Sequence, residues 1–253
     1  MQNQSIDYLS GIPLHIEVYF NDTYLASGTG FVIEKNSNNH LITNWHVLSG
    51  RDPLTQKCLS RDVAIPNNIR VWMHTKGKLG SWVKVMFNLY DENYRQKWKE
   101  KKLQDGTILD VVSLEVHLSK DVQVYPLNLS LMNTDLLMSP SETVSIIGFP
   151  YGLAAAGKFP IWKTGHIASD IDLNYSNKPL FIIDATTKPG MSGSPVIARR
   201  SGARMTSSGT SIMNGFSDKF MGIYSGRIQD GDIIDMSNLG MVWKPSVIDM
   251  LFE

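Results

Sequence analysis

The sequence predicts an all-β protein, a barrel or a sandwich, from three observations. Most of the chain consists of short runs of β-branched and aromatic residues that end at turn residues. Few segments have a helical period, so a sheet whose strands alternate with helices is not indicated. The chain has 253 residues, enough for one or two domains. A chain of that length should bury roughly 70–75% of its unfolded surface, so it needs neither disulfides nor a metal to be stable.

The expected strands follow one another from the N-terminus. The first, Pro13–Phe20, alternates along its length, and Asn21-Asp22 supplies a turn before Tyr24–Ile33. His40–Val47 is a third β-rich run. The later expected strands are Ile69–Met73, Trp82–Leu89, Leu109–Val116, Val122–Leu127, Val144–Phe149, Leu180–Ile183, Pro195–Ala198, Phe220–Tyr224 and Leu239–Val242.

Three other segments do not have the strand pattern. Asp91–Gln104 is highly charged and is either a helix or a long surface loop. Ser201–Ser217 is rich in Ser, Gly, Thr and Arg, which predicts a long, mobile hairpin loop. Pro245–Phe252 has a proline at its first position and apolar residues on one helical face, so we expect a short C-terminal helix docked on the body.

Composition excludes several classes of protein and site. There are 24 Lys+Arg and 24 Asp+Glu, so no global charge favours nucleic acid. Cys58 is the only cysteine and forms neither an intramolecular disulfide nor a Cys-rich zinc site. The six histidines have no metal-binding spacing, and we expect no metal and no cofactor.

The ends and hydropathy of the chain bear on its location. Met1–Gly11 has neither a basic leader nor an apolar core, and no run approaches the ~18 apolar residues of a membrane span. We therefore expect a cytoplasmic protein without membrane contact, unless a leader has been removed. The single cysteine agrees with a reducing compartment.

Asp184–Ile197 (DATTKPGMSGSPVI) is the most informative stretch for chemistry. Ser192 lies between two glycines, Gly190 and Gly193. A nucleophilic serine needs a close approach of substrate to backbone and N–H groups directed at the developing oxyanion, which glycines permit. A simple Gly/Ser turn between strands is the alternative interpretation.

Two further residues fit the roles of base and acid. His46 ends an apolar run and is either a general base or a core histidine. Asp110 lies between apolar residues, so if buried it needs a partner, and orienting a histidine would satisfy it. Asp105, in a turn-like QDG, is the competing acid.

Chain order discriminates between catalytic families. No histidine follows Ser192, because the last one is His166, which excludes the Ser, acid, His order of α/β-hydrolases. The subtilisin order would need an acid such as Asp22 and an α/β architecture. The order His46, Asp110, Ser192 is that of chymotrypsin.

Four motifs occur in order: SGTGFVI at Ser27–Ile33, TNWHV at Thr43–Val47, LDVVSLEV at Leu109–Val116, and the segment Asp184–Val196. Together they resemble the blocks of chymotrypsin-fold (trypsin-like) serine peptidases of the compact bacterial kind, similar to HtrA-type proteases and glutamyl endopeptidases. IIGFPYG, TGHIAS and MGIYSG are weaker matches, and the resemblance extends roughly over residues 27–226.

The resemblance implies two packed six-stranded antiparallel β-barrels with a short C-terminal helix. Residues 1–125 would form the N-terminal barrel, which carries His46 and Asp110. Residues 126–253 would form the C-terminal barrel, which carries Ser192. The two barrels would make one catalytic unit with the active site in the cleft between them.

It also implies a serine endopeptidase that cleaves protein or peptide substrates through an acyl-enzyme. The backbone N–H groups of Gly190 and Ser192 would form the oxyanion hole. Thr186 and Thr187 would lie at the base of the substrate pocket, and its wall would be Ile223, Tyr224, Ser225 and Gly226. Thr186 is not the acid that cleavage after Lys or Arg needs, and Tyr224 replaces the histidine of glutamyl endopeptidases. A medium-sized apolar or polar residue is therefore expected in the pocket.

The chain departs from the family pattern before the nucleophile. Met191 stands where Asp or Asn is usual, and there is no internal Ile-Val-Gly-Gly activation site, so activation by the trypsinogen route is not expected. A catalytically silent or latent protease-like module that binds protein therefore remains the alternative function. The sequence does not predict an oligomeric state.

Overall fold

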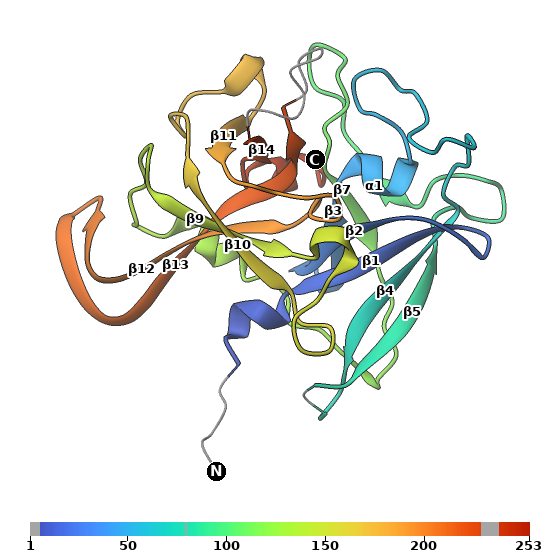
Figure 1. Cartoon of the computed structure of the whole chain (residues 1–253), viewed down its shortest axis with the longest axis horizontal. Coiled ribbons are helices and arrows are strands. Elements are labelled where there is room, and N and C mark those ends of the chain that lie inside the picture. Colours follow the sequence, from blue (N-terminus) through green and yellow to red (C-terminus); the bar gives the residue numbers. More distant parts are fainter. Residues whose placement is uncertain (1–5, 79, 229–237) are drawn as a thin grey trace.

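The computed structural model describes residues 6–78, 80–228 and 238–253. It contains two antiparallel β structures side by side, one from each half of the chain (Figure 1). The first has eight strands among the described residues, in the order β5-β4-β1-β2-β3-β7-β6, with β8 paired to β4. Their bounds are β1 Pro13–Phe20, β2 Thr23–Lys35, β3 Asn38–Thr43, β4 Asn68–Thr75, β5 Trp82–Asn88, β6 Trp98–Lys99, β7 Val112–Glu115 and β8 Val122–Gln123.

Alternating apolar residues determine the register of this sheet. In β1, Leu14, Ile16 and Val18 point into one apolar cluster, as expected for a strand with one buried face. The prediction of six strands differs from the eight described because β6 and β8, of two residues each, join six longer strands. Such short pairings leave no periodic signal in a sequence.

The second structure is a closed barrel in the order β10-β11-β14-β13-β12-β9. Its strands are β9 Thr143–Gly148, β10 Ile161–Ile167, β11 Leu180–Asp184, β12 Pro195–Thr206, β13 Gly209–Arg227 and β14 Leu239–Trp243. The all-β prediction with antiparallel sheets is thus confirmed. Closure removes the free edges that an open sheet would expose.

The helices in the described parts of the chain are all short. They are α1 Trp45–Ser49 and α2 Val247–Met250, with 3₁₀ turns η1 Tyr8–Gly11, η2 Leu129–Asn133, η3 Pro150–Gly152 and η4 Tyr175–Asn177. The C-terminal helix is confirmed but is shorter than Pro245–Phe252, and Val247, Ile248 and Leu251 pack into the core. No helix among the described residues has the length and hydropathy to cross a membrane.

One segment differs from its predicted structure, and for a second segment the structure decides between the two alternatives. Ser201–Ser217 is not a loop: it lies in β12 and β13, which pair from Pro195↔Ile223 to Thr206↔Gly209 and project from the barrel (Figure 1). Its ladder uses backbone groups, so polar side chains do not prevent it. Asp91–Gln104 contains no helix; it is a loop with the short strand β6, and Trp98 within it is buried.

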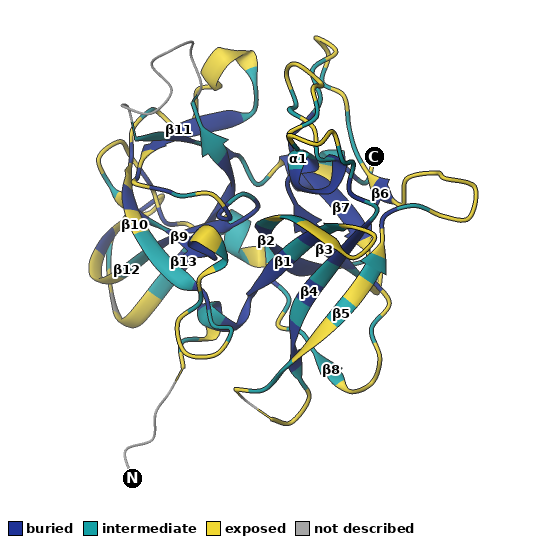
Figure 2. Ribbon diagram, turned by 45° about the vertical axis from the view of Figure 1, so that its right-hand side comes forward, coloured by how far each residue is buried: buried dark blue, intermediate teal, exposed yellow. Residues whose placement is uncertain are grey.

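One apolar cluster joins the two halves. It contains Phe31 and Leu109 from the first half and Ile147, Phe220 and Trp243 from the second. The rings of Phe31 and Phe220 meet edge to face, with centroids 5.7 Å apart. Figure 2 shows buried strands facing one another where the halves meet, with exposed residues on the outer strand β5 and the β12–β13 hairpin.

An ion cluster fastens the N-terminal segment to the barrel. Arg199 on β12 donates from Nε to Asp218 Oδ1 at 2.6 Å and from Nη2 to Asp218 Oδ2 at 3.0 Å. The same guanidinium contacts Asp7, which caps η1 through the amide of Leu9. The hydroxyl of Tyr8 donates to Asp218 at 2.7 Å, and burial with this negative neighbour raises the pKa of Tyr8 to about 12.

Replacing Arg199 by methionine should destabilise the fold. The change leaves Asp218, which is 8% exposed, without its charged partner. We expect a loss of about 1–3 kcal/mol in the free energy of unfolding, measured by urea denaturation. Arg61→Met, at an exposed position, should change it by less than ~0.5 kcal/mol. Equal stabilities of the two variants would contradict this role of Arg199.

Candidate active site

His46 lies in the first turn of a short helix, not in a strand. The predicted strand His40–Val47 ends at Thr43, Asn44 takes extended backbone angles, and α1 begins at Trp45. Gly50 ends the helix with φ 64°, and a Cβ there would lie 2.4 Å from a carbon of Pro66. Glycine is needed at that point, and the tight exit fixes α1 between β3 and the following loop.

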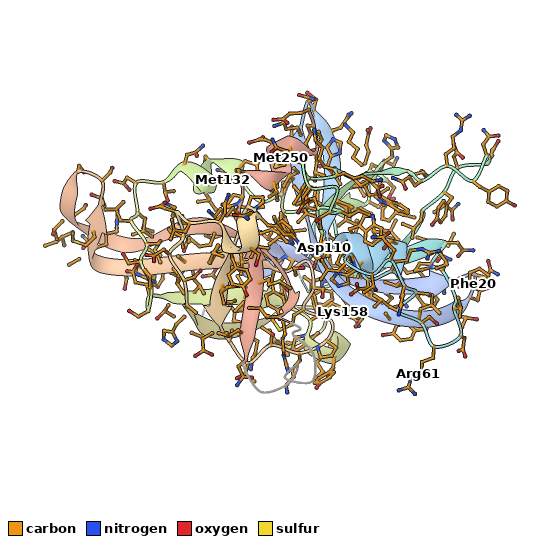
Figure 3. All side chains as sticks on the ribbon, turned by 90° about the horizontal axis from the view of Figure 1, so that it is seen from above. Phe20, Arg61, Asp110, Met132, Lys158 and Met250 are labelled. Carbon is orange, nitrogen blue, oxygen red and sulfur yellow. The ribbon has the colours of Figure 1, made fainter. Side chains whose placement is uncertain are left out.

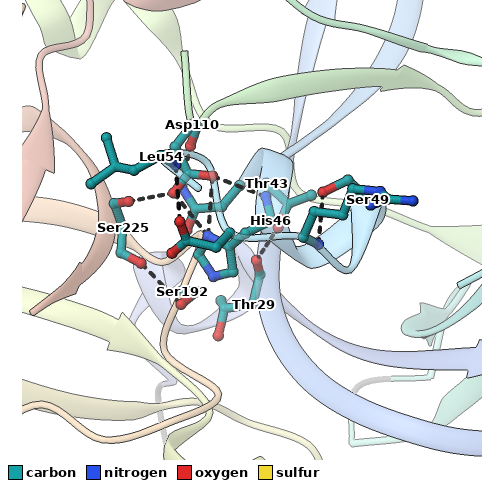
Figure 4. A network of polar contacts seen from close by, with 11 residues as sticks. Thr29, Thr43, His46, Ser49, Leu54, Asp110, Ser192 and Ser225 are labelled. Atoms are coloured by element: carbon teal, nitrogen blue, oxygen red, sulfur yellow. Dashed lines mark hydrogen bonds and ion pairs between the residues drawn. The ribbon is translucent and has the colours of Figure 1, made fainter. Parts of the chain in front are cut away.

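Asp110 is buried at 2% exposure and accepts hydrogen bonds from both halves of the protein. His46 donates its backbone N–H to Oδ1 at 2.9 Å, and its Nδ1 lies 2.8 Å from Oδ2. Ser225 Oγ on β13 donates to Oδ2 at 2.5 Å (Figure 4). Asn44 Nδ2 donates to the backbone carbonyl of Asp110 at 2.6 Å, so the main chain is held as well.

The position of Asp110 places this network at the junction of the halves. Figure 3 shows Asp110 near the middle of the molecule. Asp105, the competing acid, is exposed and accepts from the amide of Thr107 instead. Of the two acids, Asp110 is hydrogen-bonded to His46, and Asp105 is not.

The environment of His46 favours its protonated form. Burial lowers the pKa of the imidazole, but the negative charge of Asp110, its hydrogen bond and the charge of Asp52 together outweigh burial. The pKa of His46 is therefore raised above its ordinary value of 6.5. Its side chain remains 20% exposed, so solvent and substrate can reach it.

Ser192 lies in the same cavity as His46 and Asp110. Its Oγ donates to the backbone carbonyl of Ser225 at 3.0 Å (Figure 4). Among the described residues, no hydrogen bond joins Ser192 Oγ to His46. The structure thus brings the three residues together, with the hydroxyl directed at a neighbouring carbonyl.

Two buried threonines hold the turn that carries Ser192. Thr29 Oγ1 donates to the carbonyl of Gly190 at 2.8 Å and accepts from the amide of Phe149 at 3.2 Å. Thr43 Oγ1 donates to the carbonyl of Thr29 at 2.7 Å, and the amide of Thr29 donates to the carbonyl of Ser192 at 2.8 Å. Strands β2 and β3 of the first sheet therefore position a turn of the second barrel.

Both glycines of the turn are required by its packing. Gly190 has φ 92°, and a Cβ there would lie 2.4 Å from the carbonyl oxygen of Phe149. Gly193 has φ 86°, and a Cβ would lie 2.0 Å from the carbonyl oxygen of Thr29. Side chains at either position would collide with backbone, so the turn lies directly against the first sheet.

The carbonyls of the turn determine where its amides point. The carbonyl of Pro189 accepts from the amide of Tyr151 at 2.6 Å, and that of Met191 accepts from the amide of Ser194 at 3.0 Å. In a trans peptide the N–H points opposite to the preceding carbonyl. The N–H groups of Gly190 and Ser192 are therefore turned away from these contacts. Within the described residues, neither donates to a backbone carbonyl.

A family model for the trypsin-like peptidase domain matches residues 28–203. The chain belongs to the trypsin-like peptidase family. The trypsin-like fold, the hydrolase class and the serine-type endopeptidase activity expected from the sequence follow from this membership. Protein or peptide substrates follow in the same way.

Solved structures of similar arrangement include two bacterial proteases. The serine endoprotease from Yersinia pestis is 15% identical with a TM-score of 0.48, and the match covers 98% of this chain and 66% of that one. The Rv3671c protease from M. tuberculosis in its active form is 18% identical with a TM-score of 0.47, covering 96% and 80%. Its inactive form gives 18%, 0.44, 96% and 88%. No curated protein matches the chain.

In this trypsin-like peptidase the predicted pocket residues lie in different places. Ser225 and Gly226 line the cavity beside Ser192. Ile223, Tyr224 and Thr187 are buried, while Thr186 is exposed, and none of these four lines that cavity. Ile223 and Tyr224 belong to two different apolar clusters, because successive side chains of β13 point to opposite faces.

The sequence does not predict the contacts that three residues make in this site. Ser225, expected only in the pocket wall, donates to Asp110 and accepts from Ser192. Thr29 holds the turn of Ser192, and Asn44 holds the main chain of Asp110. All three residues lie inside the motifs that resemble the family, and this position in the sequence indicates that they belong near the site. The sequence does not indicate their hydrogen-bond partners, because these depend on tertiary structure.

Thr29→Val should destabilise the protein more than Thr29→Ser. Valine has a similar shape but leaves the Gly190 carbonyl and the Phe149 amide without their partner, at a cost of about 2 kcal/mol or more. Serine keeps the oxygen and removes one methyl group, worth about 0.8 kcal/mol. Urea unfolding measures both. Valine as stable as serine would show that the hydroxyl does not hold the turn.

Proposed function

We propose that the chain hydrolyses peptide bonds through a triad of His46, Asp110 and Ser192 and an acyl-enzyme intermediate. The observation that supports this most directly is the 2.8 Å contact between His46 Nδ1 and Asp110 Oδ2 in a cavity that also contains Ser192. A carboxylate at Nδ1 holds the proton on that nitrogen and leaves Nε2 as the acceptor.

In the proposed reaction Ser192 attacks the substrate carbonyl. A rotation about its Cα–Cβ bond moves Oγ from the Ser225 carbonyl towards His46, whose Nε2 takes the proton. The imidazolium then gives that proton to the leaving amine, and water hydrolyses the acyl-enzyme by the same route. Catalytic hydrogen bonds are often loose before substrate binds, which agrees with the position of Ser192 Oγ.

The oxyanion of the tetrahedral intermediate would bind the N–H groups of Gly190 and Ser192. The preceding carbonyls, of Pro189 and Met191, are held by the amides of Tyr151 and Ser194, so the two N–H groups point away from those contacts. Preorganised donors of this kind are worth about 3–4 kcal/mol each.

A latent or silent module that binds protein is the second candidate. The observation in its favour is that Ser192 Oγ is bonded to Ser225 and not to His46. The two functions differ in the reactivity of Ser192, which a fluorophosphonate measures directly.

Fluorophosphonate should label Ser192 stoichiometrically at neutral pH. His46→Ala should abolish labelling because the hydroxyl then has no base. Mass spectrometry of the intact protein and of its peptides measures the extent and the site. An unlabelled wild-type chain would favour the latent or silent module.

Substitution of the triad should reduce peptide hydrolysis by several decades. We expect a loss in kcat on the order of 10⁶ for Ser192→Ala. For Asp110→Asn we expect about 10⁴, because asparagine favours the wrong tautomer of His46. Rates on a peptide substrate that is cleaved by the wild type test both. Cleavage by Ser192→Ala at the wild-type rate would contradict the triad.

The pH profile should report the raised pKa of His46. Only the neutral imidazole accepts a proton, so kcat/KM should fall as pH decreases, with a midpoint above 6.5. Asp52→Asn removes a negative charge near His46 and should move that midpoint to lower pH. Its Oδ1 still accepts from the amides of Leu54 and Thr55, so the loop keeps its shape.

Asp62→Asn is the matched control for this charge. Asp62 is exposed in the same loop and is not among the groups that shift the pKa of His46. Its midpoint should equal that of the wild type. An unchanged midpoint in Asp52→Asn would contradict the contribution of Asp52.

A further inference from the structure

The space between Thr187 and Tyr224 is closed by the protein itself. Both residues are buried, and their hydroxyls are hydrogen-bonded to each other. The guanidinium of Arg227 donates to the carbonyl of Thr187 at 2.5 Å. The Tyr224 ring packs against Gly240, where a Cβ would lie 2.7 Å from the ring. A substrate side chain entering here would have to break a buried hydrogen bond, which is costly.

A larger space opens on the other face of β13. It is a cavity of about 470 Å³ that reaches His46, Asp110 and Ser192. This volume lies within the range of about 300–1,000 Å³ typical of ligand sites. Its inner wall is apolar and is made by Ile108, Leu180, Ile228, Met241 and Trp243.

Exposed apolar side chains surround the mouth of this cavity. Leu54 is 68% exposed, Leu59 55% and Tyr175 40%, and all three line the cavity. The leucines come from the loop after α1, and Tyr175 comes from η4 of the second half. Exposed apolar residues gathered at a cavity mark a contact site. A peptide that crosses the cleft would cover both sides of the mouth.

Gly226 lines the cavity and leaves space open in it. Its φ is not in the left-handed region, and a Cβ there would meet no atom within 4 Å. A side chain at this position therefore fits without backbone strain and would occupy the space. Gly226 thus differs from Gly190 and Gly193. A Cβ at those two positions would lie 2.4 and 2.0 Å from a backbone oxygen.

We propose that this cavity binds a large apolar side chain of the peptide substrate, Leu, Met or Phe, next to the scissile bond. It rests on the proposed function. The cavity, rather than the space between Thr187 and Tyr224, determines which peptides are cleaved.

Charged side chains are disfavoured in this cavity from both sides. Asp52 and Asp110 line the cavity together with Lys178 and Arg227. A charged substrate side chain, positive or negative, would therefore meet a residue of like charge. Asp110 already accepts from His46 and Ser225. The inner wall offers apolar contact, which rewards the burial of apolar surface.

A positional-scanning library of fluorogenic peptides tests the proposal. The wild type should prefer Leu, Met or Phe over Ala about 10- to 100-fold in kcat/KM at one position near the scissile bond, as for other apolar pockets. Gly226→Leu fills the cavity and should reduce that ratio to within about threefold. Met241→Ala enlarges it and should shift the preference from Leu towards Phe, so the test does not depend on one variant folding.

Tyr224→Phe is the matched control. It removes the hydroxyl pair with Thr187 and does not alter the cavity, so the apolar preference should persist. A preference that changes in Tyr224→Phe and persists in Gly226→Leu and Met241→Ala would overturn the proposal. So would a wild type that cleaves peptides without any large apolar preference.

Labelling by fluorophosphonate separates this proposal from the proposed function. A wild-type chain that neither labels nor cleaves contradicts the triad. A chain that labels and cleaves, but whose preference is independent of Gly226 and Met241, contradicts only the role of the cavity.

Discussion

The buried carboxylate of Asp110 is the constraint on which the rest of the structure depends. A carboxylate with 2% exposure must be paired and hydrogen-bonded, because burying an unpaired charge is costly. Its donors are the amide and Nδ1 of His46 from the first half and the hydroxyl of Ser225 from the second. Satisfying this charge and docking the two β structures are therefore one requirement. The orientation of the imidazole follows from it.

The turn of Ser192 also depends on contacts between the two halves of the protein. It belongs to the second barrel, yet its carbonyls at Gly190 and Ser192 are bonded to Thr29 on β2. Gly193 allows the turn to approach the carbonyl of Thr29 so closely that a Cβ would lie 2.0 Å away. The shared cluster of Phe31, Phe220 and their neighbours provides the apolar area behind these contacts. The polar network sets the register of the two halves, and the apolar cluster supplies the stability.

Local sequence patterns could predict the all-β fold and the order of His46, Asp110 and Ser192, because each lies in a short motif. They could not predict the second role of Ser225. Ser225 is the extra residue of an irregularity in β13 between Tyr224 and Gly226, which interrupts the regular alternation of side chains, so that Ser225 and Gly226 both line the cavity. The helix of His46 has five residues, too few for a periodic signal. The polar residues of Ser201–Ser217 predict a loop, but the segment forms a ladder because the pairing uses backbone groups.

Met191 shows how this turn is held without a charge beneath it. The position before the nucleophile is often acidic or amidic in the proteins that the sequence resembles, and such a side chain needs a polar partner when buried. Here Met191 is 0% exposed and packs with Ile183, Val196 and Tyr224 in the core of the second barrel. The turn is stabilised by the burial of Met191 and by the hydrogen bond from Thr29. Gly190 and Gly193 allow it to pack closely against neighbouring backbone. The geometry of the turn therefore depends on the packing of the barrel itself. The hydrogen bond between the hydroxyls of Tyr224 and Thr187 is part of that packing. The hydrogen bond between Thr187 and Tyr224 closes the space below the turn, and the open cavity lies on the opposite face of β13, beside Gly226.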